Sequence, residues 1–98
     1  MASYELRVKK SVAKDLRNLP VKDVEHIVRR IDKLKSEPRP PGSEKLSTQE
    51  RYRLRQGSYR IIYEIMDEER VVIIVKISHR RDVYKQLHEE SGQYIIDM

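Results

Sequence analysis

Apolar residues in the first third of the chain change their spacing once. Leu6 and Val8 alternate with polar neighbours over residues 4–8, which predicts a first strand with both side chains on one side. From Ser11, the predicted N-cap, apolar residues recur three and four positions apart on both sides of Pro20. These residues are Val12, Leu16 and Leu19 before the proline, and Val24, Ile27, Val28, Ile31 and Leu34 after it. The spacing predicts a helical hairpin, one short helix and a longer one ending near Lys35.

The second half of the chain returns to a period of two. Residues 38–43 are rich in proline and cannot continue a helix, so they predict a stiff connector. Alternating or β-branched runs then predict strands over residues 51–55, 58–67 and 71–78, with a turn at Gln56 and Gly57. A short C-terminal helix is expected from Arg81 to about Glu90, with residues 93–98 as a tail or a closing edge strand.

This order predicts an α+β fold and one domain. An N-terminal strand and a helical hairpin precede a three-stranded antiparallel sheet and a short C-terminal helix, so the helices should cover one sheet face. At 98 residues the chain has room for a single domain spanning 1–98 with one modest core, and no repeat or linker divides it.

The pairing of the last two strands follows from keeping apolar side chains on one face. A turn at residues 68–70 would put Tyr63 opposite Val75 and Arg60 opposite Ser78. One face then holds Tyr59, Ile61, Tyr63, Ile65, Val71, Ile73, Val75 and Ile77. The other face holds Arg60, Glu64, Lys76, Ser78 and Arg80.

The strand over residues 51–55 carries the most unusual pattern. Tyr52 and Leu54 point toward the core, so Arg51, Arg53 and Arg55 share the opposite face as a row of like charges. Three guanidinium groups in a row repel one another, and stability alone is a poor reason for them. A polyanion bound across the face would supply the opposing charge.

Composition agrees with such a partner. The chain has 21 Lys+Arg against 16 Asp+Glu, a net charge of +5, and a pI near 9.6, which favours nucleic acid, an anionic membrane or an acidic protein as partner. Cysteine is absent, which excludes disulfides and thiol catalysis. His26 and His88 lack metal-ligand spacing, so we expect no metal site. Without a signal-like N-terminus or an apolar run of ~20 residues, we expect a soluble cytoplasmic protein that does not enter the membrane.

Five segments together form a recognisable pattern. They are Leu19-Pro20, residues 38–42, Tyr52-Arg53-Leu54-Arg55, Tyr59-Arg60-Ile61-Ile62-Tyr63 and His79-Arg80-Arg81-Asp82-Val83-Tyr84. With them the chain resembles toxins of the RelE/ParE superfamily from toxin–antitoxin pairs, over most of its length. The resemblance implies a RelE-like fold, similar to that of small microbial ribonucleases. It also implies ribosome-dependent cleavage of mRNA in the A site, in which the RNA's own 2′-hydroxyl attacks the adjacent phosphate without a metal or other cofactor.

The resemblance also implies site residues and partners. The implied catalytic residues are Arg51, Arg53, Arg60, Arg80 and Tyr84, and the expected additional RNA contacts are Lys45, Arg55, Lys76, His79 and Arg81. The expected partners are mRNA, the ribosome with its rRNA, and a cognate antitoxin that could form a heterotetramer with the toxin. Apolar surface for the antitoxin is expected near Val83, Leu87, Ile95 and Ile96.

The general base is left open by the sequence. Arg51 and Arg53 stand where the best-known member has lysines, and an arginine is effectively never neutral, so neither can accept the proton. Tyr84 can do so if nearby guanidinium groups lower its pKa, whereas His79 titrates near neutrality without such help.

Several alternatives accompany the nuclease hypothesis. The chief one is a ParE-like poison of DNA gyrase without nuclease activity, and another is a degenerate toxin that only binds. The arginine row could be a solvated face or a docking surface for an acidic antitoxin. Arg60 and Arg80 could instead form structural ion pairs with Glu64 or Asp82, and Tyr84 could pack the last helix on the sheet.

Overall fold

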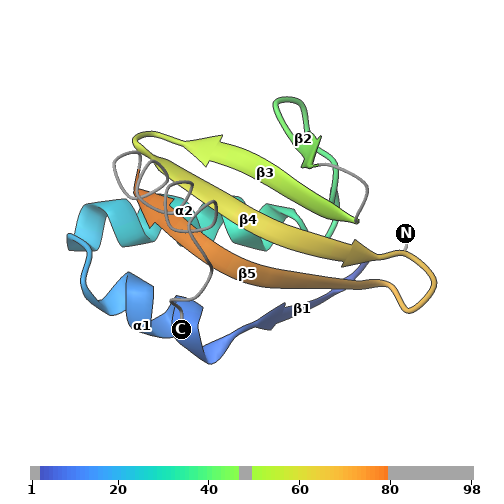
Figure 1. The fold of residues 1–98 in the computed structure, drawn as a ribbon, viewed down its shortest axis with the longest axis horizontal. Helices are drawn as coiled ribbons and strands as arrows, with labels where there is room; N and C mark the ends of the chain where they lie inside the picture. Colours follow the sequence, from blue (N-terminus) through green and yellow to red (C-terminus); the bar gives the residue numbers. More distant parts are fainter. Residues whose placement is uncertain (1–2, 47–49, 80–98) are drawn as a thin grey trace, which may run out of the picture.

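The computed structural model describes residues 3–46 and 50–79, which form two helices and a five-stranded mixed sheet (Figure 1). The elements are β1 (Glu5–Val8), α1 (Lys10–Arg17), α2 (Val21–Lys33), β2 (Glu44–Leu46), β3 (Arg51–Gln56), β4 (Tyr59–Met66) and β5 (Val71–His79). The α+β class is confirmed. The helix expected from Arg81 and the segment 93–98 lie outside the described residues.

The sheet has more strands than the three-stranded sheet that the sequence predicted. Its order is β1-β5-β4-β3-β2, with β1 parallel to β5 and the other neighbours antiparallel. The first strand was expected but not its pairing, because a parallel partner is reached only through the helical hairpin. Strand β2 was not expected, since its three residues are too few to show a period.

Helix α2 lies against one face of the sheet, and α1 packs at the β5 edge with Val12 in the same core. Figure 1 shows α2 crossing behind the central strands and α1 beside β5. Helix α1 begins at Lys10 with Lys9 as its N-cap, so the prediction of Ser11 as the cap is wrong; the cap makes no side-chain hydrogen bond. Pro20 is the N-cap of α2, where a proline is tolerated because no intrahelical N–H is needed.

A single core joins the helices to the sheet. Its buried members from the helices are Val12, Ile27 and Ile31, joined by Leu34, the C-cap of α2. Its buried strand members are Tyr52, Leu54, Tyr59, Ile61, Tyr63, Ile65, Val72, Ile74 and Ile77. Because Tyr52 and Leu54 point into this core, the intervening arginines of β3 point the other way, as predicted.

The pairing of β4 with β5 contains one irregularity. Arg60 lies opposite Ser78, as predicted, but Tyr63 lies opposite Ile74 and not opposite Val75. Val75 is an additional residue between the partners of Ile62 and Tyr63, as in a β-bulge.

The irregularity changes which residues of β5 face the core. Val72 and Ile74 are fully buried, whereas Ile73 and Val75, predicted for the core face, are only half-buried. The turn follows the same shift, because Met66 pairs with Val71 and leaves residues 67–70 as the turn. The half of the hairpin that carries Arg60 keeps the predicted register.

Hydrogen bonds hold the proline-rich connector against the turn between β4 and β5. Arg39 donates through Nη2 and Nη1 to both carboxylate oxygens of Asp67, at 2.8 and 3.2 Å. Its Nε donates to the Tyr52 hydroxyl at 2.9 Å, and its guanidinium lies 5.1 Å from the centre of that ring. The Tyr4 hydroxyl also donates to Asp67, at 2.8 Å, and Tyr63 donates to the Pro38 carbonyl at 2.8 Å. We call Arg39, Asp67, Tyr52 and Tyr4 the connector clamp.

Candidate nucleic-acid interface

The sheet face away from the helices carries the cationic side chains singled out in the sequence. Arg51, Arg53 and Arg55 project from β3, between the buried side chains of Tyr52 and Leu54. Arg60 projects from β4 to the same face, because its neighbours Tyr59 and Ile61 are buried in the core. The alternation of both strands therefore places four arginines on one face.

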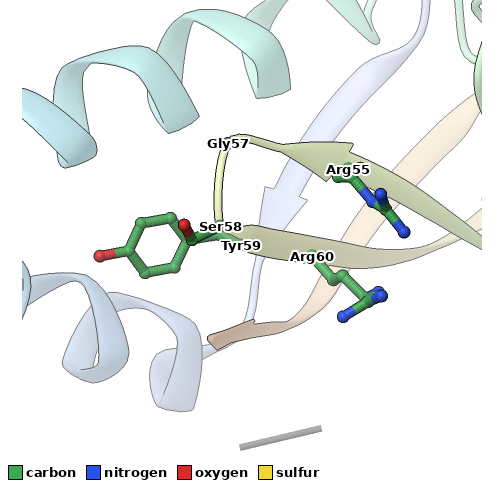
Figure 2. Close-up of a pocket in the computed structure, with 5 residues that line it drawn as sticks. All are labelled: Arg55, Gly57, Ser58, Tyr59 and Arg60. Atoms are coloured by element: carbon green, nitrogen blue, oxygen red, sulfur yellow. The ribbon is translucent and has the colours of Figure 1, made fainter. Parts of the chain in front are cut away.

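Arg55 and Arg60 lie directly opposite each other next to the β3–β4 turn. Figure 2 shows the two side chains extending to the same side of the hairpin, while the Tyr59 ring points away from them. They line a pocket of about 170 Å³ together with Gly57, Ser58 and Tyr59. Gly57 allows this tight turn because its φ is +60°, a conformation that favours glycine. Like charges directly opposite each other destabilise a sheet, so the pair suits the binding of an anion.

Carboxylates offset part of the arginine row. Arg51 is bonded to Glu64, with Nη2 at 2.5 Å and Nε at 3.1 Å from the same carboxylate oxygen, and Arg53 is bonded to Glu44 across the strands. The expectation that a bound polyanion would supply the missing charge is thus too simple for two of the three arginines. Arg55 forms no hydrogen bond or ion pair with any residue of 3–46 or 50–79.

The electrostatics of Glu44 show that the guanidinium groups converge. The hydrogen bond and the positive charge of Arg53 lower the pKa of the Glu44 carboxyl, and the charges of Arg55 and Arg60 lower it further. Glu44 is therefore held ionised near three arginines. A phosphate placed on this face would meet the same three charges.

The remaining predicted RNA contacts are divided between the faces. Lys76 lies opposite Ile62, and its Nζ is 3.9 Å from a carboxylate oxygen of Asp15 on α1. Lys45 lies opposite Tyr52, on the face away from the arginines, and donates to Glu50 at 3.3 Å.

His79 is also on the face away from the arginines. It lies opposite Tyr59, and the two rings meet edge to face at 5.2 Å between their centres. The structure thus brings together Arg51, Arg53, Arg55, Arg60 and Lys76, and separates Lys45 and His79 from them. Arg80, Arg81 and Tyr84 lie outside the described residues.

A second pocket, of about 280 Å³, lies on the helix side of the same turn. It is lined by Asp23, His26, Gln56, Gly57, Ser58, Tyr59 and His79. The Tyr59 hydroxyl donates to Oδ2 of Asp23 at 2.7 Å, and this bond raises the pKa of Tyr59. The sequence offered no signal for this pocket, because Asp23 and His26 are polar positions on a helix more than thirty residues before Tyr59.

Glu44 and Glu64 were also not predicted as site residues. Glu64 could have been found, since it was placed on the face of Arg60; Glu44 could not, because its short strand was not expected. Within residues 3–46 and 50–79 no cluster of histidine, aspartate and glutamate could hold a metal ion. Neither α1 nor α2 is long and apolar enough to cross a membrane.

Comparison with known proteins places these features in a family. The sequence profile of the ParE toxins of type II toxin–antitoxin systems, parDE, matches residues 6–84. The toxin candidate RelE1 of Methanocaldococcus jannaschii is 33% identical over 86 residues, which cover 84% of this chain and 96% of that protein. Toxin RelG of Mycobacterium tuberculosis is 31% identical over 88 residues, covering 85% of this chain and 98% of RelG.

Solved structures show the same fold. The toxin–antitoxin complex RelBE2 of Mycobacterium tuberculosis contains a chain that matches with a TM-score of 0.71 and 28% identity. The match covers 81% of this chain and all of that one.

Proposed function

The chain belongs to the RelE/ParE superfamily of toxins of type II toxin–antitoxin systems, and on this premise we propose that it is a ribosome-dependent endoribonuclease. It would cleave mRNA in the ribosomal A site and so stop translation, which requires a cytoplasmic location. The toxins RelE1 and RelG, which are related over nearly their whole lengths, carry RelE-type names, and this supports the proposal.

The observation that carries the proposal is the pair formed by Arg55 and Arg60. Their side chains lie directly opposite each other and line one pocket, and the charges of both lower the pKa of the nearby Glu44 carboxyl, which is bonded to Arg53. Two guanidinium groups directly opposite each other concentrate positive charge at this turn, and RNA offers a phosphate at every nucleotide. A guanidinium group can bind two phosphate oxygens at once, which suits a crowded phosphate in the transition state.

In the proposed reaction the 2′-oxygen of a nucleotide attacks the phosphorus on its 3′ side. The bond from phosphorus to the 5′-oxygen of the next nucleotide breaks, leaving a cyclic phosphate and a 5′-hydroxyl. A base takes the proton of the 2′-hydroxyl, and an acid protonates the departing 5′-oxygen. The residues we assign to the site are Arg51, Arg53, Arg60, Arg80 and Tyr84.

We assign the base to Tyr84 and not to His79. His79 packs edge to face against Tyr59 on the helix side of the sheet, away from the arginine row. Glu44 is a weak candidate for the base, because its pKa is lowered by Arg53. A tyrosine close to several guanidinium groups would have a lowered pKa, as a base in this position needs.

A cognate antitoxin is the proposed protein partner. The structure from Mycobacterium tuberculosis is a toxin–antitoxin complex, and the match covers the whole length of one chain in it. We propose a comparable complex here, with a heterotetramer of two toxins and two antitoxins as its form.

Primer extension on an mRNA during translation tests the nuclease. The wild type should produce cuts in phase with codons, and Arg60→Ala should reduce their rate by about 10²–10³, the effect of removing one preorganised charge from a transition state. Arg29→Ala is the matched control, since it removes an exposed arginine from α2 on the other side of the sheet. Equal thermal midpoints would exclude unfolding. Wild-type protein that arrests growth without codon-phased cuts would overturn the proposal.

A second function is favoured by the matched family profile, which is that of the ParE toxins. In that case the protein would poison DNA gyrase and cleave no RNA. Stalled gyrase complexes on DNA, found together with uncut mRNA, would establish it. The Arg55–Arg60 pair would then be a surface for a protein or for DNA.

A further inference from the structure

The β3–β4 turn separates two pockets that share three residues. Gly57, Ser58 and Tyr59 line both the pocket of Arg55 and Arg60 and the second pocket on the helix side. An RNA strand held by a phosphate on the arginine side would therefore pass close to the second pocket. A base attached to that strand can reach around the turn, since base and phosphate of one nucleotide point in different directions.

The second pocket contains polar groups whose hydrogen-bonding capacity is not used within residues 3–46 and 50–79. Asp23 accepts the Tyr59 hydroxyl through Oδ2, and its other oxygen, Oδ1, has no partner there. The side chains of His26 and Gln56 likewise have no hydrogen-bond partner in this part of the chain. The aromatic rings of Tyr59 and His79 complete the lining. Hydrogen-bonding capacity that this part of the chain leaves unused, beside aromatic rings, suits a planar ligand with polar edges.

We propose that this second pocket binds a nucleobase of the RNA whose phosphate lies on Arg55 and Arg60, and that it prefers guanine. The inference rests on the RNA-binding function proposed above and names a base-reading site for it. At about 280 Å³ the pocket has the volume of roughly nine waters at ~30 Å³ each, which accommodates a purine.

Guanine follows from the chemistry of Asp23. A carboxylate only accepts hydrogen bonds, so the edge of the base that faces Asp23 must carry hydrogen-bond donors. Guanine presents two adjacent donors on its Watson–Crick edge, N1–H and the N2 amino group, whereas adenine places an acceptor beside its single amino group. The Gln56 amide and the His26 imidazole can donate to the guanine O6. The rings of Tyr59 and His79, which are in edge-to-face contact, supply the aromatic part of the pocket lining.

Asp23→Asn tests this assignment with little change in shape. The asparagine oxygen can still accept the Tyr59 hydroxyl, while the amide nitrogen donates where the carboxylate oxygen accepted. The probe is a set of fluorescent 2′-O-methyl tetranucleotides, which cannot be cleaved, carrying one guanine or one adenine at each position among uracils. Binding is measured by anisotropy without ribosomes.

The wild type should bind the best guanine oligonucleotide about tenfold more tightly than the adenine one, the discrimination of one bidentate contact. Asp23→Asn should remove this preference, and the control Asp32→Asn should retain it, because Asp32 lies farther along α2 and is paired with Lys35. Arg55→Ala should weaken the binding of all the oligonucleotides by the same factor.

Each failure has its own signature. Saturable binding with equal affinity for all the bases, or a guanine preference that survives in Asp23→Asn, overturns the base site alone. Absence of any saturable RNA binding by the wild type overturns both this inference and the nuclease. A guanine preference that Asp23→Asn removes, in a protein that cuts no translated mRNA, supports the base site and overturns only the nuclease.

Discussion

The two ends of the sheet use arginine in opposite ways. At the β4–β5 turn, Arg39 is bonded to Asp67 and to Tyr52, and both bonds raise its pKa. At the β3–β4 turn, Arg55 is exposed, lies opposite another arginine and has no ion pair with a described residue. The first arrangement satisfies the donors of the guanidinium group inside the protein. The second leaves them for a ligand.

The difference teaches that the segment on which an arginine lies, connector or strand, does not by itself decide its role in this fold. What decides it is whether a carboxylate and a hydroxyl from other segments arrive at the same place. Asp67 and Tyr52 do so for Arg39. Arg51 and Arg53 are intermediate, because each has one carboxylate but stays on the open face.

The largest effect on stability is expected for Arg39→Ala. Hydrogen bonds to a charged group contribute about 1.5–3 kcal/mol each when sheltered, but the Arg39 side chain is 42% exposed, so solvent screening reduces the sum. We expect a loss of about 1–2 kcal/mol in the free energy of unfolding, measured by urea denaturation. Arg55→Ala is the control and should leave this free energy unchanged or slightly increased. An equal loss of unfolding free energy in both variants would contradict the idea that only Arg39 is held by partners within the protein.

A smaller effect, on RNA binding, is expected for Arg55→Ala. One fewer phosphate contact should lower the slope of log affinity against log salt by about 0.7, the value per contact for a single strand. Titrations with a 2′-O-methyl oligonucleotide at four salt concentrations measure the slope. Arg39→Ala should leave the slope unchanged, because its guanidinium group is already bound to Asp67. An equal decrease in slope in both variants would contradict a specific role for the β3–β4 end.

Glu44→Gln should produce a modest gain. Its carboxylate is bonded to Arg53 and competes with a phosphate for the same guanidinium group. Removing one exposed charge should increase RNA affinity about two- to fivefold at low salt, with a smaller gain at high salt. Glu25→Gln on the exposed surface of α2 is the control. A decrease in affinity would mean that Glu44 instead holds Arg53 in its binding orientation.

The smallest effect concerns pH. Hydrogen bonds from Arg39 and from Tyr4 lower the pKa of Asp67 below its usual 3.8. Because the folded pKa is the lower one, the stability that Asp67 contributes is fully present above about pH 5 and is lost as the pH falls through the folded pKa. Urea midpoints between pH 5 and pH 2.5 should therefore fall less steeply in Asp67→Asn than in the wild type. If the urea midpoints of the two proteins fell equally with pH, the pKa of Asp67 would be the same in the folded and unfolded states.

The sequence by itself determined the helical hairpin, the strands of the second half and the face on which the arginines lie. These features depend on local periodicity, because a side chain's face is set by its position along its own strand or helix. The alternation around Tyr52 and Leu54 and the i, i+3, i+4 spacing from Val24 to Leu34 were therefore sufficient. The sequence also predicted correctly that Arg60 lies opposite Ser78, because both residues lie next to alternating apolar positions.

Only the tertiary structure decided what surrounds those arginines. The parallel pairing of β1 with β5, the extra residue Val75 and the short strand that carries Glu44 all depend on contacts between distant segments, which leave no period in the sequence. The same holds for Asp23, which reaches Tyr59 from another element. Periodicity specifies which way a side chain points, but its partners come from the rest of the fold. For the Arg55 and Arg60 pair, and for the pocket behind it, the partners determine the chemistry.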